Sequence, residues 1–147
     1  LVLVLLLDAA ALASPSLAGR TLPAALLVMP LVGRVPVLAG TSRRSPSARA
    51  DGFGALFAGV TGDLALAVGA GAALGVCALV GALATGGPVG AGAFGGAALL
   101  AWAVAALWQR HLVRRLGGFT GDTLGSLVEV TQAAFVLALA LTVGWAA

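Results

Sequence analysis

The chain has 147 residues, of which 61% are hydrophobic and only 9% charged, and its mean hydropathy is +1.10. The polar groups are too few to cover a surface in water, and the composition therefore excludes a water-soluble globular protein. The net charge of +3 comes from eight arginines and five acids, and the chain has no Tyr. It offers neither a basic stripe nor a platform for base stacking, and we expect no nucleic-acid partner.

Five apolar stretches recur along the chain with polar residues between them. A helix needs roughly 20 residues to cross a hydrocarbon core of about 30 Å. The stretches cover about residues 1–17, 22–39, a segment within 53–83, 89–108 and 124–146. The predicted fold is therefore all-α, a polytopic transmembrane helix bundle with about five spans, and residues 1–147 form a single integral-membrane domain.

Two of these stretches carry further signals. The first begins at Leu1 inside an apolar run, so we expect the chain to be the C-terminal part of a longer protein. A signal peptide is a weaker alternative because no basic region precedes the run and Asp8 interrupts it. The second stretch contains Pro23, Pro30 and Pro36, which predict a kinked or broken helix. The third is long enough to contain an extra bend.

The arginines predict the orientation of the bundle. They cluster in two connections, after the second and the fourth stretch: Arg43, Arg44 and Arg49 in the first, and Arg110, Arg114 and Arg115 in the second. Two spans separate these connections, so both lie on the same side of the membrane. Under the positive-inside rule, loops 41–52 and 110–122 are predicted to be cytoplasmic, in the inner membrane of a prokaryotic cell.

Small residues dominate the middle of the chain. Gly71 and Gly75 stand four residues apart, as do Gly92 and Gly96. Small residues at this spacing allow helix backbones to approach closely inside a bilayer, so they predict helix-packing faces. Cys77 lies in an apolar stretch and is expected to be a small packing residue.

A compact polar segment separates the last two apolar stretches. It runs from residue 114 to residue 125 as Arg-Arg-Leu-Gly-Gly-Phe-Thr-Gly-Asp-Thr-Leu-Gly. If the fourth helix continues past Trp108, Arg110 and Arg114 share one helical face and would face an anion together. The two glycines end that helix, and Asp122 or Thr123 is predicted to cap the next one.

Two carboxylates follow in the last stretch. Glu129 comes seven residues after Asp122, two helical turns onward on nearly the same face. An Asp and a Glu aligned in this way can hold Mg²⁺ against phosphate oxygens while arginines neutralise the remaining charge. The alternatives are that the arginines only anchor the topology, that Asp122 only caps a helix, and that His111 is an interfacial side chain. Glu129 is harder than these residues to explain by a purely structural role, because it lies inside an apolar segment.

Residues 114–125 followed by Glu129 resemble the C-terminal signature of the cobalamin synthase family, the adenosylcobinamide-GDP ribazoletransferases. Two upstream segments, Gly33-Arg34 and Ala48-Arg49-Ala50-Asp51-Gly52-Phe53-Gly54, are similar to the middle region of that family. The resemblance covers nearly the whole chain and is strong from Arg110 onward.

The resemblance implies a Mg²⁺-dependent membrane transferase of cobalamin biosynthesis. Such an enzyme joins adenosylcobinamide-GDP to α-ribazole or its phosphate and releases GMP. It further implies metal binding by Asp122 and Glu129, with Arg34 as a secondary candidate of the site. Phosphate binding is implied for seven residues: Arg114, Arg115, Gly117, Gly118, Thr120, Gly121 and Arg49.

One feature of the family has no counterpart in residues 1–147, namely its aspartate-rich N-terminal motif. We therefore expect this chain to hold part of the active site and to be inactive alone. A CDP-alcohol phosphotransferase fits less well because Ala48-Arg49 precedes Asp51-Gly52 and the later aspartates are missing. A transporter or permease subunit, with Glu129 and Asp63 on an ion path, is the non-enzymatic alternative. Homo-oligomerisation is left open.

Overall fold

The computed structural model describes residues 2–42 and 53–146, and these are helical apart from their connections. The elements are α1 (Val2–Leu12), a 3₁₀ turn η1 (Pro15–Leu17), α2 (Thr21–Gly40), α3 (Phe53–Phe57), α4 (Asp63–Thr85), α5 (Pro88–Leu116) and α6 (Gly121–Ala146). In the described ranges the β-structure amounts to one isolated bridge, between Ser42 and Thr61. The all-α prediction is confirmed.

In the part of the chain that the structure describes, four helices are long and apolar enough to cross a membrane: α2, α4, α5 and α6. They correspond to the last four of the five predicted spans. The first predicted span is represented by α1, an apolar helix of 11 residues. Eleven residues rise only about 16 Å, roughly half of a hydrocarbon core. The predicted bend in the third stretch is present, because a turn containing Gly59 (φ +77°) separates α3 from α4.

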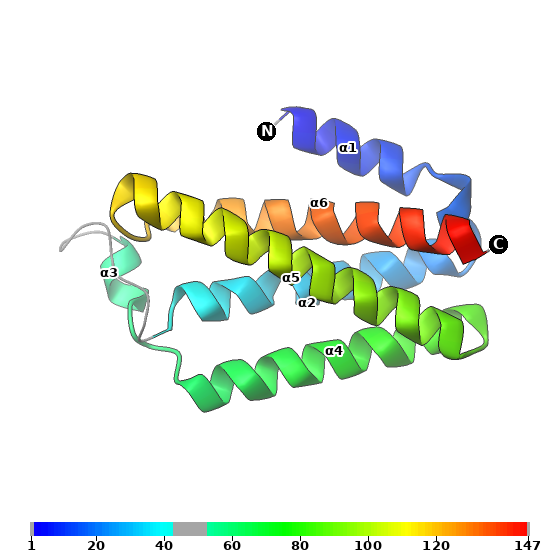
Figure 1. The fold of residues 1–147 in the computed structure, drawn as a ribbon, viewed down its shortest axis with the longest axis horizontal. Coiled ribbons are helices and arrows are strands. Elements are labelled where there is room, and N and C mark those ends of the chain that lie inside the picture. The colour runs from blue at the N-terminus through cyan, green and yellow to red at the C-terminus, as the bar shows by residue number, and fades with distance from the viewer. Residues whose placement is uncertain (1, 43–52, 147) are drawn as a thin grey trace.

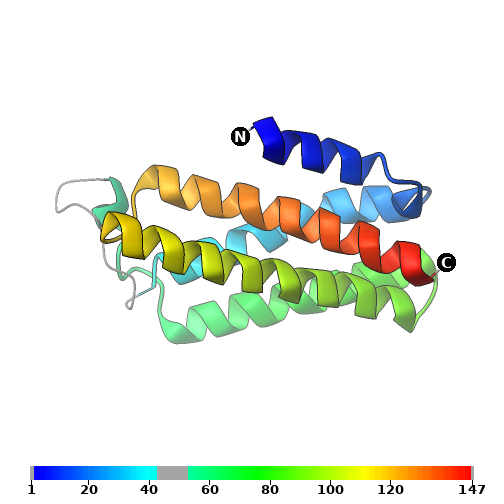
Figure 2. The same ribbon diagram turned by 45° about the horizontal axis from the view of Figure 1, so that its top comes forward.

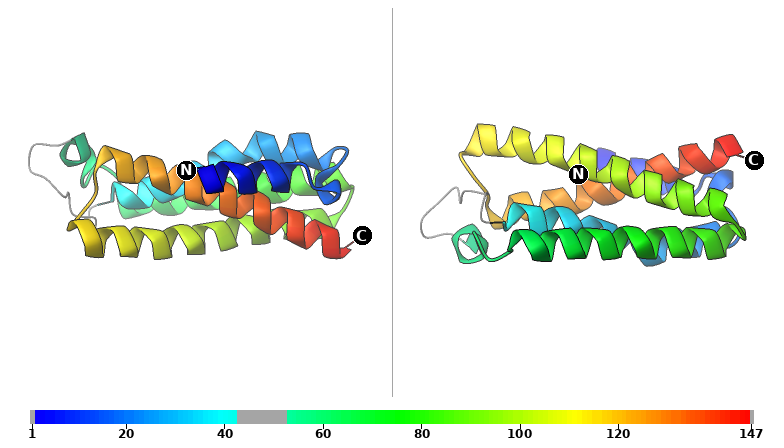
Figure 3. Two further views of the ribbon diagram at one scale, coloured as in Figure 1. Left: turned by 90° about the horizontal axis from the view of Figure 1, so that it is seen from above. Right: turned by 60° about the horizontal axis from the view of Figure 1, so that its bottom comes forward.

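The helices pack as an elongated bundle (Figure 1). Helices α2, α5 and α6 lie together, α4 runs along α2 and α5, and α1 lies on α6 (Figure 2). The ends of α2 and α5 and the starts of α4 and α6 gather at one end of the bundle (Figure 3). We call this the arginine end, because α5 finishes there with Arg110, Arg114 and Arg115. The ends of the two helices that precede the arginine-containing connections therefore lie at the same end of the bundle.

The interior is built largely from small side chains on α5 that let α6 approach closely. Ala97, Ala98, Ala101 and Ala105 are almost fully buried. Phe94 and Phe135 fill the space between the two helices, with their ring centroids 6.2 Å apart in an edge-to-face arrangement. Aromatic pairs favour this geometry. Cys77 is buried in the same core, as predicted for a packing residue.

Helix α2 continues through its prolines instead of breaking. Pro36 has no N–H, so the carbonyl of Val32, four residues earlier, loses its usual helical partner. The indole N–H of Trp102 on α5 donates to that carbonyl at 3.0 Å. A neighbouring helix thus supplies the missing hydrogen bond, which is how proline is tolerated inside a membrane helix.

The glycines that mediate close helix packing are not the predicted ones. A Cβ added at Gly81 would lie 2.3 Å from the carbonyl oxygen of Gly90, so α4 and α5 touch there. The predicted faces, which contain Gly71, Gly75, Gly92 and Gly96, have open space within 4 Å of an added Cβ. That prediction is wrong in this structure because i, i+4 spacing defines a face of a helix but not what the face meets.

We expect Gly81→Ala to destabilise the protein and Gly75→Ala to be tolerated. Adding a methyl group where no space exists typically costs about 1–3 kcal/mol, whereas the methyl group at Gly75 meets no atom. Thermal unfolding in detergent, followed by circular dichroism, measures both. Equal midpoints for the two variants would contradict the packing of α4 on α5.

We also expect Trp102→Phe to lower the free energy of unfolding by about 1 kcal/mol, because the Val32 carbonyl loses its donor. In a Pro36→Ala background the new backbone N–H can satisfy that carbonyl, so Trp102→Phe should cost less. Unfolding of the four proteins in a double-mutant cycle measures the difference. The same cost in both backgrounds would show that Trp102 does not compensate for Pro36.

Candidate functional site

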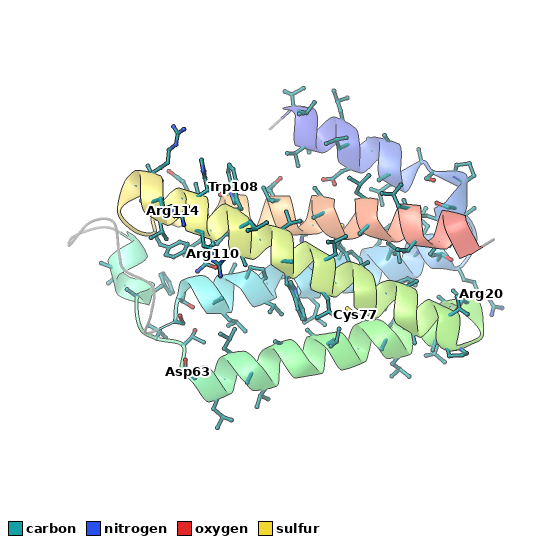
Figure 4. The ribbon with its side chains drawn as sticks, viewed as in Figure 1. Arg20, Asp63, Cys77, Trp108, Arg110 and Arg114 are labelled. Atoms are coloured by element: carbon teal, nitrogen blue, oxygen red, sulfur yellow. The ribbon has the colours of Figure 1, made fainter. Side chains whose placement is uncertain are left out.

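Helix α5 continues past Trp108 to Leu116, as predicted, and carries its arginines in the last turns. It ends where Gly117 adopts a left-handed conformation (φ +77°) and donates its N–H to the carbonyl of Val113 at 2.9 Å. Arg110, Arg114 and Arg115 are all exposed. Cations at this position complement the helix dipole. Figure 4 shows Arg110 and Arg114 at the arginine end with Trp108, far from Arg20.

The turn into α6 is held by a reciprocal capping box. The N–H of Thr120 donates to the Thr123 hydroxyl oxygen at 2.8 Å, and the N–H of Thr123 donates to the Thr120 hydroxyl oxygen at 3.3 Å. Thr120 is therefore the N-cap of α6, and Thr123 completes the box three residues later. This corrects the prediction that Asp122 or Thr123 is the cap. The carboxylate of Asp122 is left exposed at the first turn of α6.

Trp108 ties α5 to the start of α6. Its indole N–H donates to the hydroxyl of Ser126 at 3.2 Å, and that hydroxyl donates to the Thr123 carbonyl at 2.8 Å. The His111 ring stacks on Trp108 with centroids 5.5 Å apart. The exposed, stacked His111 fits the interfacial role that the sequence favoured. These contacts hold the arginines of α5 and Asp122 of α6 on one rigid corner of the bundle.

A small core stabilises the same corner from inside. Phe119, Leu127 and Ala105 are buried together beneath the turn. Gly40, the last residue of α2, packs against Leu124, since a Cβ added there would lie 2.9 Å from its Cδ2. The end of α2 is therefore held against the start of α6.

The two predicted metal-binding carboxylates lie on one exposed face of α6. Asp122 and Glu129 are both exposed, and seven residues of regular helix place them on nearly the same face about 10 Å apart along the axis. Gly125 lies between them and has open space beside it. The face is thus accessible between the two carboxylates.

Arg34 and Glu129 are charged groups within membrane-spanning helices. Arg34 lies about 9 Å from the end of α2 and Glu129 about 12 Å into α6, and both are exposed. Both flank the close contact of Gly33 with Gln132, where an added Cβ would lie 2.9 Å from the Gln132 Cγ. Charge placed against lipid is costly. Each of these two side chains therefore meets water, a ligand or protein in the membrane.

Asp8 on α1 adds a group that the sequence-based site did not include. Its Oδ1 atom is buried with no hydrogen-bond partner among the described residues, and Glu129 is close enough for the two carboxylates to interact electrostatically. The sequence did contain a signal that could have identified Asp8, because an acid inside an apolar run is a functional candidate by default. Only the packing of α1 on α6 brings it beside Glu129.

The described residues include no group of three or more His, Cys, Asp or Glu side chains that could hold a metal ion. Mg²⁺ commonly uses only one or two carboxylates and completes its octahedron with water and substrate phosphates. Asp122 and Glu129, about 10 Å apart along α6, are too distant to ligate one ion together, but each offers a single carboxylate that fits that mode of binding. The unpartnered Asp8 oxygen is a further acceptor within electrostatic range of Glu129. They do not fit a cage made of protein ligands alone.

The remaining predicted phosphate-binding residues are only partly placed. Gly117, Gly118, Thr120 and Gly121 form the turn between α5 and α6, within the rigid corner. The N–H groups of Gly117 and Thr120 are already engaged in the helix caps. Arg49, with the neighbouring Arg43, Arg44 and Asp51, lies outside the described residues.

Comparison with known families shows which proteins this chain is similar to. The family model described as cobalamin-5-phosphate synthase matches residues 1–140. The chain belongs to the cobalamin-5-phosphate synthase family. The resemblance seen in the arginine–glycine segment and Glu129 is thereby confirmed. No solved structure matches the chain.

Curated relatives in this family include three that are each named adenosylcobinamide-GDP ribazoletransferase. The one from Pseudomonas putida is 44% identical over 96% of this chain and 52% of its own length. Those from Stutzerimonas stutzeri and Frankia casuarinae are 42% and 37% identical, over 83% and 80% of this chain and 45% and 43% of their own. The chain spans about half the length of the curated relatives it matches.

We expect Thr120→Ala to lower the free energy of unfolding by about 1 kcal/mol, because α6 loses its N-cap. Asp122→Asn should leave stability nearly unchanged, since that exposed carboxylate is outside the capping box. Unfolding midpoints in detergent measure both variants. A larger loss of stability from Asp122→Asn than from Thr120→Ala would show that Thr120 is not the cap of α6.

Proposed function

We propose that this chain belongs to a membrane transferase that joins adenosylcobinamide-GDP to α-ribazole or its phosphate and releases GMP. Membership of the cobalamin-5-phosphate synthase family supports this, and three bacterial relatives are named for that activity. The observation that carries it is the corner where the last turns of α5, with their exposed arginines, are joined by a capped turn to the first turn of α6, which contains Asp122. The comparisons do not favour a transporter, because the relatives are named as transferases.

The reaction needs charge neutralisation on a diphosphate. An α-ribazole hydroxyl attacks the phosphorus attached to cobinamide, a new P–O bond forms, and the P–O–P bond to GMP breaks as the hydroxyl proton is lost. Negative charge develops on the phosphate oxygens and on the departing GMP. Arg114 and Arg115 would bind these oxygens, with Arg110 one turn away and Arg49 as a further phosphate ligand. Fixed cations that stabilise developing charge are the main means of catalysis in such transfers.

In this proposal Mg²⁺ would be held by the carboxylate of Asp122 or of Glu129, with its remaining ligands supplied by water and by oxygens of the diphosphate. When bound, it would neutralise phosphate charge that the arginines leave uncompensated. Asp122 stands at the N-terminus of α6, whose positive dipole end also favours an anionic ligand. Glu129 lies deeper, and its exposed charge, like that of Arg34 on α2, requires a polar environment.

We further propose that the arginine end faces the cytoplasm of a prokaryotic cell and that the membrane is the inner membrane. The positive-inside rule supports this orientation, because α2 and α5, each followed or ended by arginines in the sequence, both end at the same end of the bundle. The relatives are bacterial proteins. A substrate with a nucleotide diphosphate and a soluble nucleoside would meet the site from that side.

Metal-dependent release of GMP from adenosylcobinamide-GDP, measured with the full-length protein, tests this function. We expect Asp122→Asn and Glu129→Gln each to lower kcat at least about 100-fold, the typical loss when one electrostatic stabiliser is removed. Both should also raise the Mg²⁺ concentration needed for half-maximal rate. Asp63→Asn, which changes an acid at the same end of the bundle but outside the site, serves as the matched control.

Full turnover by Asp122→Asn would remove that residue from the metal site while leaving the proposed reaction intact. The absence of GMP release from the wild-type protein, together with substrate flux in reconstituted vesicles, would instead overturn the reaction and favour a transporter.

A further inference from the structure

The end of the bundle opposite the arginine end contains an apolar groove between α2 and α4. Its volume is about 360 Å³. The apolar walls come from both helices, as Pro23, Ala24, Leu27, Val80, Leu83 and Ala84. Leu27 and Leu83 remain 71% and 69% exposed, whereas the two alanines leave room between them. The groove therefore opens on the outer surface of the bundle that the described residues form.

Arg20 stands at the mouth of this groove, immediately before α2. Its side chain makes no capping hydrogen bond, and no described carboxylate or carbonyl pairs with its guanidinium. The start of α2 adds the positive end of a 20-residue helix beside it. Figure 4 shows Arg20 at the opposite end from Arg110 and Arg114, so it lies where one layer of lipid headgroups meets the bundle.

An apolar groove within the bilayer and an unpaired cation at its headgroup level together match one class of ligand. We propose that the groove binds an acyl chain of an anionic glycerophospholipid whose phosphate is held by Arg20. The volume falls within the range of ligand pockets, about 300–1,000 Å³. Basic positions between membrane helices bind phospholipid headgroups in this way, through charge and hydrogen bonds from the guanidinium.

This site is separate from the proposed transferase site. None of the residues that line it belongs to the arginine end, and no step of the proposed reaction uses them. A phospholipid here would hold α2 and α4 together where side chains leave space between them.

The proposal is tested by titrating delipidated full-length protein with phosphatidylglycerol and counting the bound lipids by native mass spectrometry. The wild type should take up one lipid more tightly than the rest. Arg20→Gln should weaken that first binding step about fivefold, as expected for one cation near a phosphate, and Arg20→Lys should retain most of it. Binding of diacylglycerol, which has no phosphate, should not respond to Arg20→Gln.

Ala84→Phe should fill the groove and abolish the tight step, whereas Ala72→Phe makes the same change at an exposed position of α4 outside the groove and should not. Wild-type affinity in both Arg20→Gln and Ala84→Phe would overturn the proposal. It would also be overturned if the wild type bound no tight lipid and a Leu83→Cys variant formed disulfide-linked dimers, since a second copy would then cover the groove.

Discussion

The joint between α5 and α6 is the contact on which the rest of this structure depends. A left-handed glycine ends one helix, two threonines cap the next through reciprocal hydrogen bonds, and a tryptophan binds across the pair. The glycine and the two threonines satisfy backbone groups that would otherwise be orphaned near hydrocarbon, where no water is available to replace them, and the tryptophan holds the two helices together. Because the joint is rigid, the cations of one helix and the carboxylate of the other keep a fixed geometry.

The low dielectric of the bilayer explains why the polar groups are so few and so grouped. Arg34 and Glu129 could not remain in spanning helices unless a polar environment met them, and Asp8 on α1 lies within electrostatic range of Glu129 on α6. Such groups are retained at a cost, which points to function instead of stability. The proposed diphosphate site thus reaches from the rigid corner along one face of α6 into the membrane. Its carboxylates are too few to form a metal cage and suit an ion shared with substrate.

Particular residues show how far sequence reasoning reaches. The continuation of α5 to Leu116, the break at Gly117 and the shared face of Asp122 and Glu129 all follow from local rules, and the structure has them. The predicted cap of α6 was wrong by two or three positions, because several nearby hydroxyl and carboxyl groups can each cap a helix. The packing glycines were also wrong, since Gly81 and Gly90 meet across a helix pair although they are nine residues apart and share no repeat.

The sequence by itself determined that the chain is a helical membrane protein, where its helices lie, which connections share a side, and which residues resemble a known family. These properties follow from hydropathy, length and local propensity, which act between near neighbours in the chain. Only the tertiary structure decided that Trp102 donates a hydrogen bond to the Val32 carbonyl, that Asp8 lies near Glu129, and that Arg20 lines an apolar groove. Such pairings depend on the rotation and crossing of helices, which are set by the packing of whole side-chain surfaces and leave no local pattern in the sequence.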